Sequence, residues 1–233
     1  MTLPQVTWHC AKAVLALTSP LHVIVQRRRL KNTHHFCNRQ AGQILRQDGL
    51  RSEALLFASY LDILNHGSSW SDMGFRNISH YYNCREDSGL WHGPAAPAEC
   101  HYYFNLALKH WRRGSREKAF FYLGAATHIL QDLCVPHHAG GLVFSGHKYF
   151  EDWARNHYED FAVNQGGLYN LGDCASRWVK QNALVAASYL PEVGQDHSPA
   201  VAQVCGIMLT RAQQTTAGFW HFFLQKIKES SPR

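Results

Sequence analysis

Residues 118–138 read KAFFYLGAATHILQDLCVPHH, and this stretch decides how the chain is interpreted. When it is drawn as a helix, apolar residues cover nearly its full circumference, which is typical of a helix in a protein interior. His128 and Asp132 lie four residues apart, so a helix directs both side chains from one face. Burying an ionised carboxylate is costly unless a cation or a polar partner compensates. The pair therefore indicates either a hydrogen-bonded core pair or part of a metal site.

Further imidazole and carboxylate groups favour the metal site. Pro136 ends the expected helix and is followed by two histidines, and His147 and Glu151 then repeat the four-residue spacing. Another carboxylate and imidazole, Asp72 and His80, stand in an expected long loop. Zinc is bound by such groups, and a carboxylate can bridge two ions. The residues together predict a multinuclear metal site.

The composition and the spacing of apolar residues predict the fold class. With 45% hydrophobic and 17% charged residues, the 233-residue chain is neither a disordered tail nor a coiled coil. Apolar residues at three- and four-residue spacing predict helices at about 40–46, 52–64, 98–113, 115–133, 147–163, 175–190 and 200–228. Residues 65–97, rich in Gly, Ser and Asn, predict a loop. No repeat or linker divides the chain and no apolar run reaches 18 residues, so the sequence predicts one all-α domain without a transmembrane helix.

Charge and cysteine content narrow the classes of function. The net charge of +6 favours anionic partners such as phosphates, nucleic acids or lipid headgroups. Seven cysteines form no C-x-x-C motif, so neither a zinc ribbon nor a thioredoxin motif is predicted. The 16 histidines are far more than a surface requires, and they direct attention to metal chemistry.

These motifs together resemble the bacterial zinc-dependent phospholipase C family, which includes phosphatidylcholine-hydrolysing enzymes and the catalytic domain of clostridial alpha-toxin. The resemblance rests on H-x-x-x-D at 128–132, P-x-H at 136–138 and H-x-x-x-E at 147–151, and it extends to LTRAQQTTAGF at 209–219. It assigns residues 32–228 to a zinc-dependent phospholipase C-like domain. Residues 1–31 match nothing in the family, and we interpret them as a leader or a misassigned start.

The resemblance implies an all-helical fold with zinc ions in a cleft. Carried over position by position, the implied ligands are Asp72, His80, His128 and Asp132 for one ion, His138, His147 and Glu151 for a second, and His34 with a bridging Asp132 for a third. The family places one ligand ten residues beyond the helix histidine, which implies His138 rather than His137. In the family an N-terminal tryptophan completes the third site, whereas Trp8 stands 26 residues before His34. Two to three zinc ions are therefore expected.

The activity implied by the resemblance is hydrolysis of a glycerophospholipid to diacylglycerol and a phosphorylated headgroup by a metal-activated water. Asp72 is implied as a ligand and as a candidate catalytic base. Met73 and Asn77 stand where the phosphatidylcholine-specific members carry aromatic residues, so no choline preference is carried over. Peripheral contact with a membrane surface and an extracellular location are also implied, without an obligate protein partner. No signal peptide is predicted, because the basic cluster at 27–31 follows the apolar stretch instead of preceding it.

Two alternatives stay open at this point. Single-strand-specific zinc nucleases share the fold and the metal site, and the positive charge suits a nucleic acid. Their second motif typically ends in aspartate, so Glu151 favours the phospholipase. The other alternative is a catalytically impaired relative that binds metal or lipid.

Overall fold

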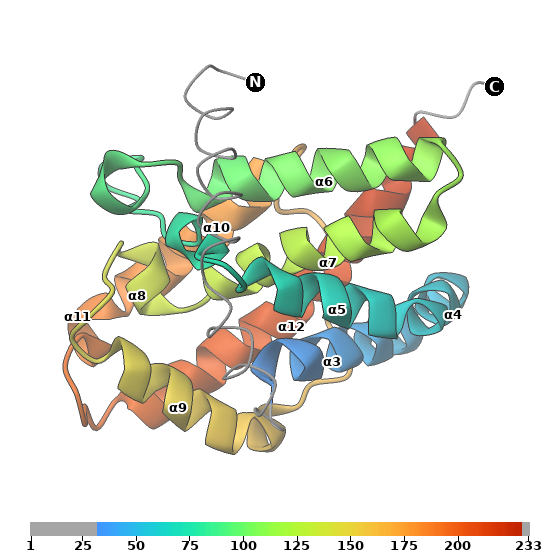
Figure 1. The fold of residues 1–233 in the computed structure, drawn as a ribbon. Coiled ribbons are helices and arrows are strands. Elements are labelled where there is room, and N and C mark those ends of the chain that lie inside the picture. Colours follow the sequence, from blue (N-terminus) through green and yellow to red (C-terminus); the bar gives the residue numbers. More distant parts are fainter. Residues whose placement is uncertain (1–31, 230–233) are drawn as a thin grey trace.

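The computed structural model describes residues 32–229, and these form a set of packed helices (Figure 1). The helices are α3 (Thr33–Gln47), α4 (Arg51–Ser59), α5 (Leu61–Ser71), α6 (Ala96–Arg112), α7 (Arg116–Asp132), α8 (Pro136–Ala139), α9 (His147–His157), α10 (Ala175–Ser188), α11 (Leu190–Val193) and α12 (Val201–Glu229). Three 3-10 turns join them: η1 (Arg76–Ser79), η2 (Leu90–His92) and η3 (Tyr158–Phe161). Residues 32–229 contain no strand, and an isolated antiparallel bridge joins Asn83 to Ser88. The predicted all-α fold is confirmed, while residues 1–31, with Trp8, lie outside the described residues.

None of the helices in residues 32–229 combines the length and the apolarity needed to cross a bilayer.

Helix α7 is central, and residues 123–132 within it are all buried. It packs against α5 and α6, which lie beside it in Figure 1. Two glycines allow the close crossing of α5 and α7. A Cβ on Gly67 of α5 would lie 1.9 Å from the carbonyl oxygen of Phe121, and one on Gly124 of α7 would lie 2.1 Å from that of Leu64. The two helices therefore touch through their backbones, which a larger residue at either position would prevent.

The long helix α12 joins the remaining helices to α7 through large aromatic side chains. Trp220 is fully buried, stacks on Phe57 of α4 with ring centroids 4.6 Å apart, and donates Nε1–H to Thr127 Oγ1 of α7 at 3.0 Å. Trp178 of α10 is also fully buried and donates its indole N–H to the carbonyl of Gly172 at 3.0 Å. Both indoles thus bury their ring area while keeping their polar atom satisfied.

The structure differs from the sequence prediction at the start of the expected loop. Helix α5 continues to Ser71, whereas residues 65–97 were predicted to be loop from residue 65 onwards. Gly67, Ser68 and Ser71 are buried in the helix, two of them turned toward the histidines described below. Small polar residues are typical of loops, but here Gly67 allows the close crossing with α7 and the two serines contact histidines. The prediction was therefore wrong for residues 65–71 because the contact with α7 outweighs the local preference.

Candidate metal centre

The predicted ligands lie on six different elements whose ends converge. His128 and Asp132 occupy the buried C-terminal half of α7, as the sequence predicted. Asp72 directly follows α5, and His80 follows η1. The remaining ligand candidates are His34 in the first turn of α3, His138 in α8, and His147 and Glu151 in α9.

Asp72, His80, His128 and Asp132 form the first cluster, in which one ligand atom of each residue lies within 4.8 Å of the others. Asp132 Oδ2 lies 2.8 Å from His80 Nδ1 and 3.0 Å from His128 Nε2. Asp72 Oδ1 lies 3.0 Å from the same His128 nitrogen. Two helices and one loop thus direct two carboxylates and two imidazoles at a common point.

Three atoms of this cluster are placed to bind a cation. His80 Nδ1, His128 Nε2 and Asp132 Oδ2 are buried and make no hydrogen bond within the described part of the chain, although they lie close together. Their spacing places each nitrogen beside an oxygen without the alignment that an N–H donor requires. Buried polar atoms are almost always paired, so a set of three that points inward requires an explanation. Imidazole and carboxylate donors at this spacing fit a zinc ion.

The other ring nitrogen of each histidine in the first cluster is held by a serine of α5. His80 Nε2 lies 3.2 Å from Ser71 Oγ, and His128 Nδ1 lies 3.4 Å from Ser68 Oγ. Such contacts fix the orientation of a metal-binding imidazole. Sequence reasoning missed both serines because they fell in the stretch predicted to be loop. Their three-residue spacing on an apolar helix face is the signal that could have identified them.

His138, His147 and Glu151 form the second cluster. Glu151 Oε1 lies 3.2 Å from His138 Nε2 and 2.9 Å from His147 Nε2. Each histidine donates its Nδ1–H to a backbone carbonyl, that of His80 at 2.9 Å and that of Val143 at 3.2 Å. Both Nε2 atoms therefore face Glu151 Oε1, where they are hydrogen-bonded to the carboxylate and where a metal ion would replace the N–H donors.

The electrostatics of both clusters show that the carboxylates attract positive charge. Burial opposes protonation of His128, but Asp132 and Asp72 outweigh it and hold the pKa of His128 well above its ordinary value. Burial also opposes protonation of His138, but Asp132 and Glu151 outweigh it and raise the pKa of His138 to about 9. Without a metal, protonated His128 and His138 therefore balance part of the carboxylate charge, and zinc must displace these protons.

His34 lies beside the first cluster without belonging to it. Its Nε2 is 3.5 Å from Asp132 Oδ1, its ring centroid is 4.0 Å from that of His128, and its Nδ1 is 2.9 Å from Gln131 Oε1. Burial and the neighbouring His128 lower the pKa of His34 to about 4, so the ring is neutral near pH 7. The adjacent His35 instead contacts Ser69 and the carbonyl of Asn65, and His137 belongs to neither cluster.

Ligand candidates of both clusters line one cavity of about 550 Å³. Met73, Asn77 and Tyr81 also line it, and Tyr81 stacks on His138 with ring centroids 4.4 Å apart. Away from the candidate ligands the lining includes an apolar part, formed by Cys37, Cys134, Phe150, Cys205, Met208 and Leu209, beside polar residues such as Arg155. The cavity can therefore hold a molecule with a polar end at the candidate ligands and an apolar remainder.

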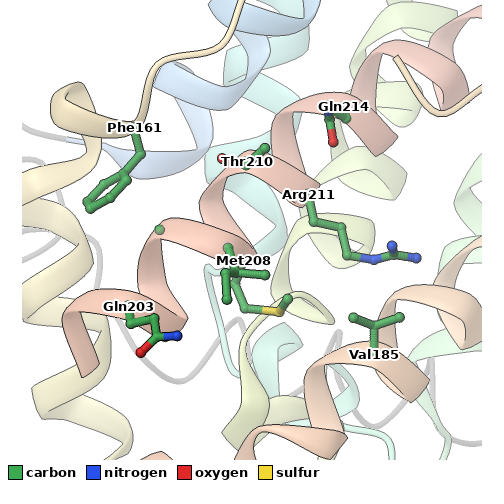
Figure 2. Close-up of a pocket in the computed structure, with 9 residues that line it drawn as sticks. Phe161, Val185, Gln203, Met208, Thr210, Arg211 and Gln214 are labelled. Carbon is green, nitrogen blue, oxygen red and sulfur yellow. The ribbon is translucent and has the colours of Figure 1, made fainter. Parts of the chain in front are cut away.

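A second hollow of about 570 Å³ runs along α12 (Figure 2). Its lining contains no histidine and no carboxylate. The guanidinium of Arg211 in this hollow is already bound, because it donates to Asn182 Oδ1 at 3.0 Å and to the carbonyl of Gln181 at 3.2 Å. The groups suited to catalysis thus lie in the first cavity.

Comparisons with known proteins identify the family. The profile of the family described as zinc dependent phospholipase C matches residues 33–170. The phospholipase C of Listeria monocytogenes is 25% identical over 232 residues, which cover 85% of this chain and 78% of that protein. The phospholipase C of Clostridium perfringens is 27% identical over 144 residues, only 36% of its length. The alpha toxin from Clostridium absonum has the same fold, with a TM-score of 0.74 at 20% identity over 85% of this chain and 64% of the toxin.

The family predicted from the sequence motifs is thereby confirmed, and nothing in the comparisons favours the nuclease alternative. The profile covers more than half of the chain and includes each of the eight predicted ligand positions. This chain is a member of the zinc-dependent phospholipase C family.

Proposed function

We propose that this protein is a zinc-dependent phosphodiester hydrolase that cleaves a glycerophospholipid to diacylglycerol and a phosphorylated headgroup. The observation that carries the proposal is the inward convergence of the unpaired atoms of His80, His128 and Asp132, in a cavity shared with the second cluster. Membership of the family supports zinc as the metal and a phospholipid as the substrate.

The proposed ligand sets follow the clusters. Asp72, His80, His128 and Asp132 hold one ion, His138, His147 and Glu151 hold a second, and His34 with Asp132 holds a third, which gives two to three zinc ions per chain. Bound zinc supplies a Lewis acid for the phosphoryl group and lowers the pKa of a coordinated water to near 7. The protein residues supply the anionic charge and the fixed geometry that such ions need.

Asp72 is the proposed catalytic carboxylate. Both first-cluster carboxylates line the cavity, and Asp72 is the more accessible of the two, since its side chain is 40% exposed and that of Asp132 is 7% exposed. Desolvation works against ionisation, but His128 and His80 keep the pKa of Asp72 below its ordinary value. Near neutral pH it is therefore an anion that can orient the attacking water and accept its proton.

The proposed substrates are glycerophospholipids as a class, with no particular headgroup. A quaternary ammonium is recognised by aromatic rings. Beside Asp72 the cavity instead presents the thioether of Met73 and the amide of Asn77, so we propose no preference for choline. The apolar part of the cavity suits the glyceride portion of a phospholipid.

We propose that the loops that carry Trp91 and Phe144 contact the membrane surface. Trp91 is 77% exposed and Phe144 is 80% exposed, and large apolar side chains in such positions mark interaction sites. Phe144 lies in the segment between α8 and α9, which carry the second cluster. The two loops adjoin, since a Cβ on Gly141 would lie 3.5 Å from that of Asn83. We also propose an extracellular location, which rests on the resemblance to the family.

Elemental analysis combined with two lipid substrates tests the proposal. Protein without a histidine tag should bind two to three zinc ions per chain and release diacylglycerol from phosphatidylcholine or phosphatidylglycerol vesicles. Asp132→Asn should lose zinc and activity, whereas Asp62→Asn, an exposed carboxylate on α5, should keep both. Cleavage of single-stranded DNA without any release of diacylglycerol would support the nuclease alternative instead. Zinc binding without either activity would support the impaired relative.

A further inference from the structure

Gln131 lies directly behind His34 and next to Asp132 in the sequence. Its Oε1 is 2.9 Å from His34 Nδ1, and only 4% of the residue is exposed. Sequence reasoning gave this residue no role, because a glutamine in a helix is usually a surface residue. A buried amide beside a candidate ligand needs a reason, and its other contacts provide one.

Both hydrogens of the Gln131 amide already have acceptors. Nε2 donates to Asn38 Oδ1 of α3 at 2.9 Å and to Thr216 Oγ1 of α12 at 2.9 Å. Thr216 has one hydroxyl hydrogen, and it donates this to the carbonyl of Ala212 at 2.7 Å. The Thr216 oxygen can therefore only accept from Gln131.

The side-chain amide of Asn38 is also held in one orientation, by Asn65 of α5. Its Nδ2 donates to Asn65 Oδ1 at 2.9 Å, which leaves Asn38 Oδ1 facing Gln131. Turning the Gln131 amide over alone would place its oxygen against Asn38 Oδ1 and would require Thr216 to abandon its bond to Ala212. Three helices thus fix one amide orientation, in which Oε1 faces His34.

An amide oxygen has no hydrogen, so His34 Nδ1 must be the donor in this contact. A neutral imidazole carries one N–H, and the lone pair is then on Nε2, the nitrogen that lies 3.5 Å from Asp132 Oδ1. We propose that Gln131 is a positioning residue that holds His34 in the Nδ1–H tautomer and presents its Nε2 lone pair beside Asp132. The inference deepens the proposed function, because a cation shared by His34 and Asp132 requires this tautomer.

Nitrogen-15 NMR of metal-free protein with labelled histidines tests the tautomer without any activity assay. His34, assigned by its loss in His34→Gln, should show a protonated Nδ1 and an unprotonated Nε2. In Gln131→Met, which keeps the side-chain length but has no acceptor, the Nδ1–H preference should be lost. Gln213→Met is the matched control, since Gln213 is a buried glutamine that bonds to the carbonyls of Phe161 and Leu209 and to no candidate ligand.

Zinc titration of the same variants provides the second measurement. Gln131→Met should bind its weakest zinc ion about 10- to 100-fold less tightly than wild type, as is usual when a residue behind a ligand is removed. Gln213→Met should match wild type even if both variants are less stable to urea. A protonated Nε2 in wild type, or an unchanged tautomer in Gln131→Met, would overturn the inference. Absence of zinc binding by wild type would overturn the proposed function, while the tautomer result would still decide this inference.

Discussion

Replacing Gly124 by alanine tests whether the close crossing of α5 and α7 sets the geometry of the first cluster. The added Cβ would lie 2.1 Å from the carbonyl oxygen of Leu64, and ordinary contact begins near 3.4 Å. Because the obstacle is backbone, the helices must separate by more than one ångström. Asp72 follows α5 and His128 lies on α7, so this separation acts directly on their 3.0 Å contact.

The expected effect on stability and on metal binding can be given as magnitudes. Overpacking costs about 1–3 kcal/mol, and the better helix propensity of alanine recovers about 1 kcal/mol, so the free energy of unfolding should fall by up to about 2 kcal/mol. Zinc sites tolerate displacements of about 0.2 Å, and a misplacement of about 1 Å lowers catalysis about 100-fold. Gly124→Ala should therefore lose first-cluster zinc and most of the activity. The second cluster, on α8 and α9, is joined to the first only through His138, so its ion should be lost to a smaller extent.

Gly42→Ala on α3 is the matched control, because a Cβ at Gly42 would meet nothing within 4 Å. This substitution should raise the free energy of unfolding by about 0.5–1 kcal/mol and leave the zinc content unchanged. Urea unfolding with and without a chelator measures stability, and elemental analysis measures zinc. A Gly124→Ala protein with wild-type stability and a full complement of zinc would refute the argument from the helix crossing.

Two further predictions concern contacts outside the candidate metal centre. Asp48→Asn should lower the free energy of unfolding by about 1 kcal/mol near pH 7, because the carboxylate accepts from Tyr169 at 2.6 Å and from two backbone amides. Desolvation opposes it, but these bonds lower the pKa of Asp48, so the difference from wild type in urea unfolding should shrink as the pH falls below about 4. The double variant Trp91→Ser with Phe144→Ser should hydrolyse vesicles about tenfold more slowly but a monomeric short-chain phospholipid at the wild-type rate. Leu55→Ser, 71% exposed on α4, should behave as wild type on both substrates, and an equal loss on both by the double variant would contradict membrane contact.

The parts of the site that the sequence predicted are those with short spacing on one helix. His128 and Asp132, like His147 and Glu151, are four residues apart, and helix geometry alone brings their side chains together. The all-α fold followed in the same way from the spacing of apolar residues. The grouping of Asp72 and His80 with α7 came from the resemblance to the family, because no local spacing relates them.

The residues that hold the candidate ligands in place could not be predicted from local pattern. Ser68 and Ser71 are residue types typical of loops, but they are helical and buried in α5, which Gly67 lets approach α7 closely. Gln131 acts through Asn38 and Thr216, which lie 93 and 85 residues away in the sequence. Contacts of this kind depend on how the helices pack, and that information appears only in three dimensions.

One contact of this kind also joins the two clusters. His138 of the second cluster donates its Nδ1–H to the carbonyl of His80, a residue of the first cluster, and its own carbonyl accepts from the amide of Tyr82 at 2.9 Å. The segment after η1 therefore supplies a ligand to one cluster and sets the ring orientation in the other. A shift of this segment must move both sets of candidate ligands together, because both bonds are to its backbone. The close packing of α5 on α7 fixes where this segment begins. It therefore affects the position of the first cluster directly and that of the second through the hydrogen bond of His138.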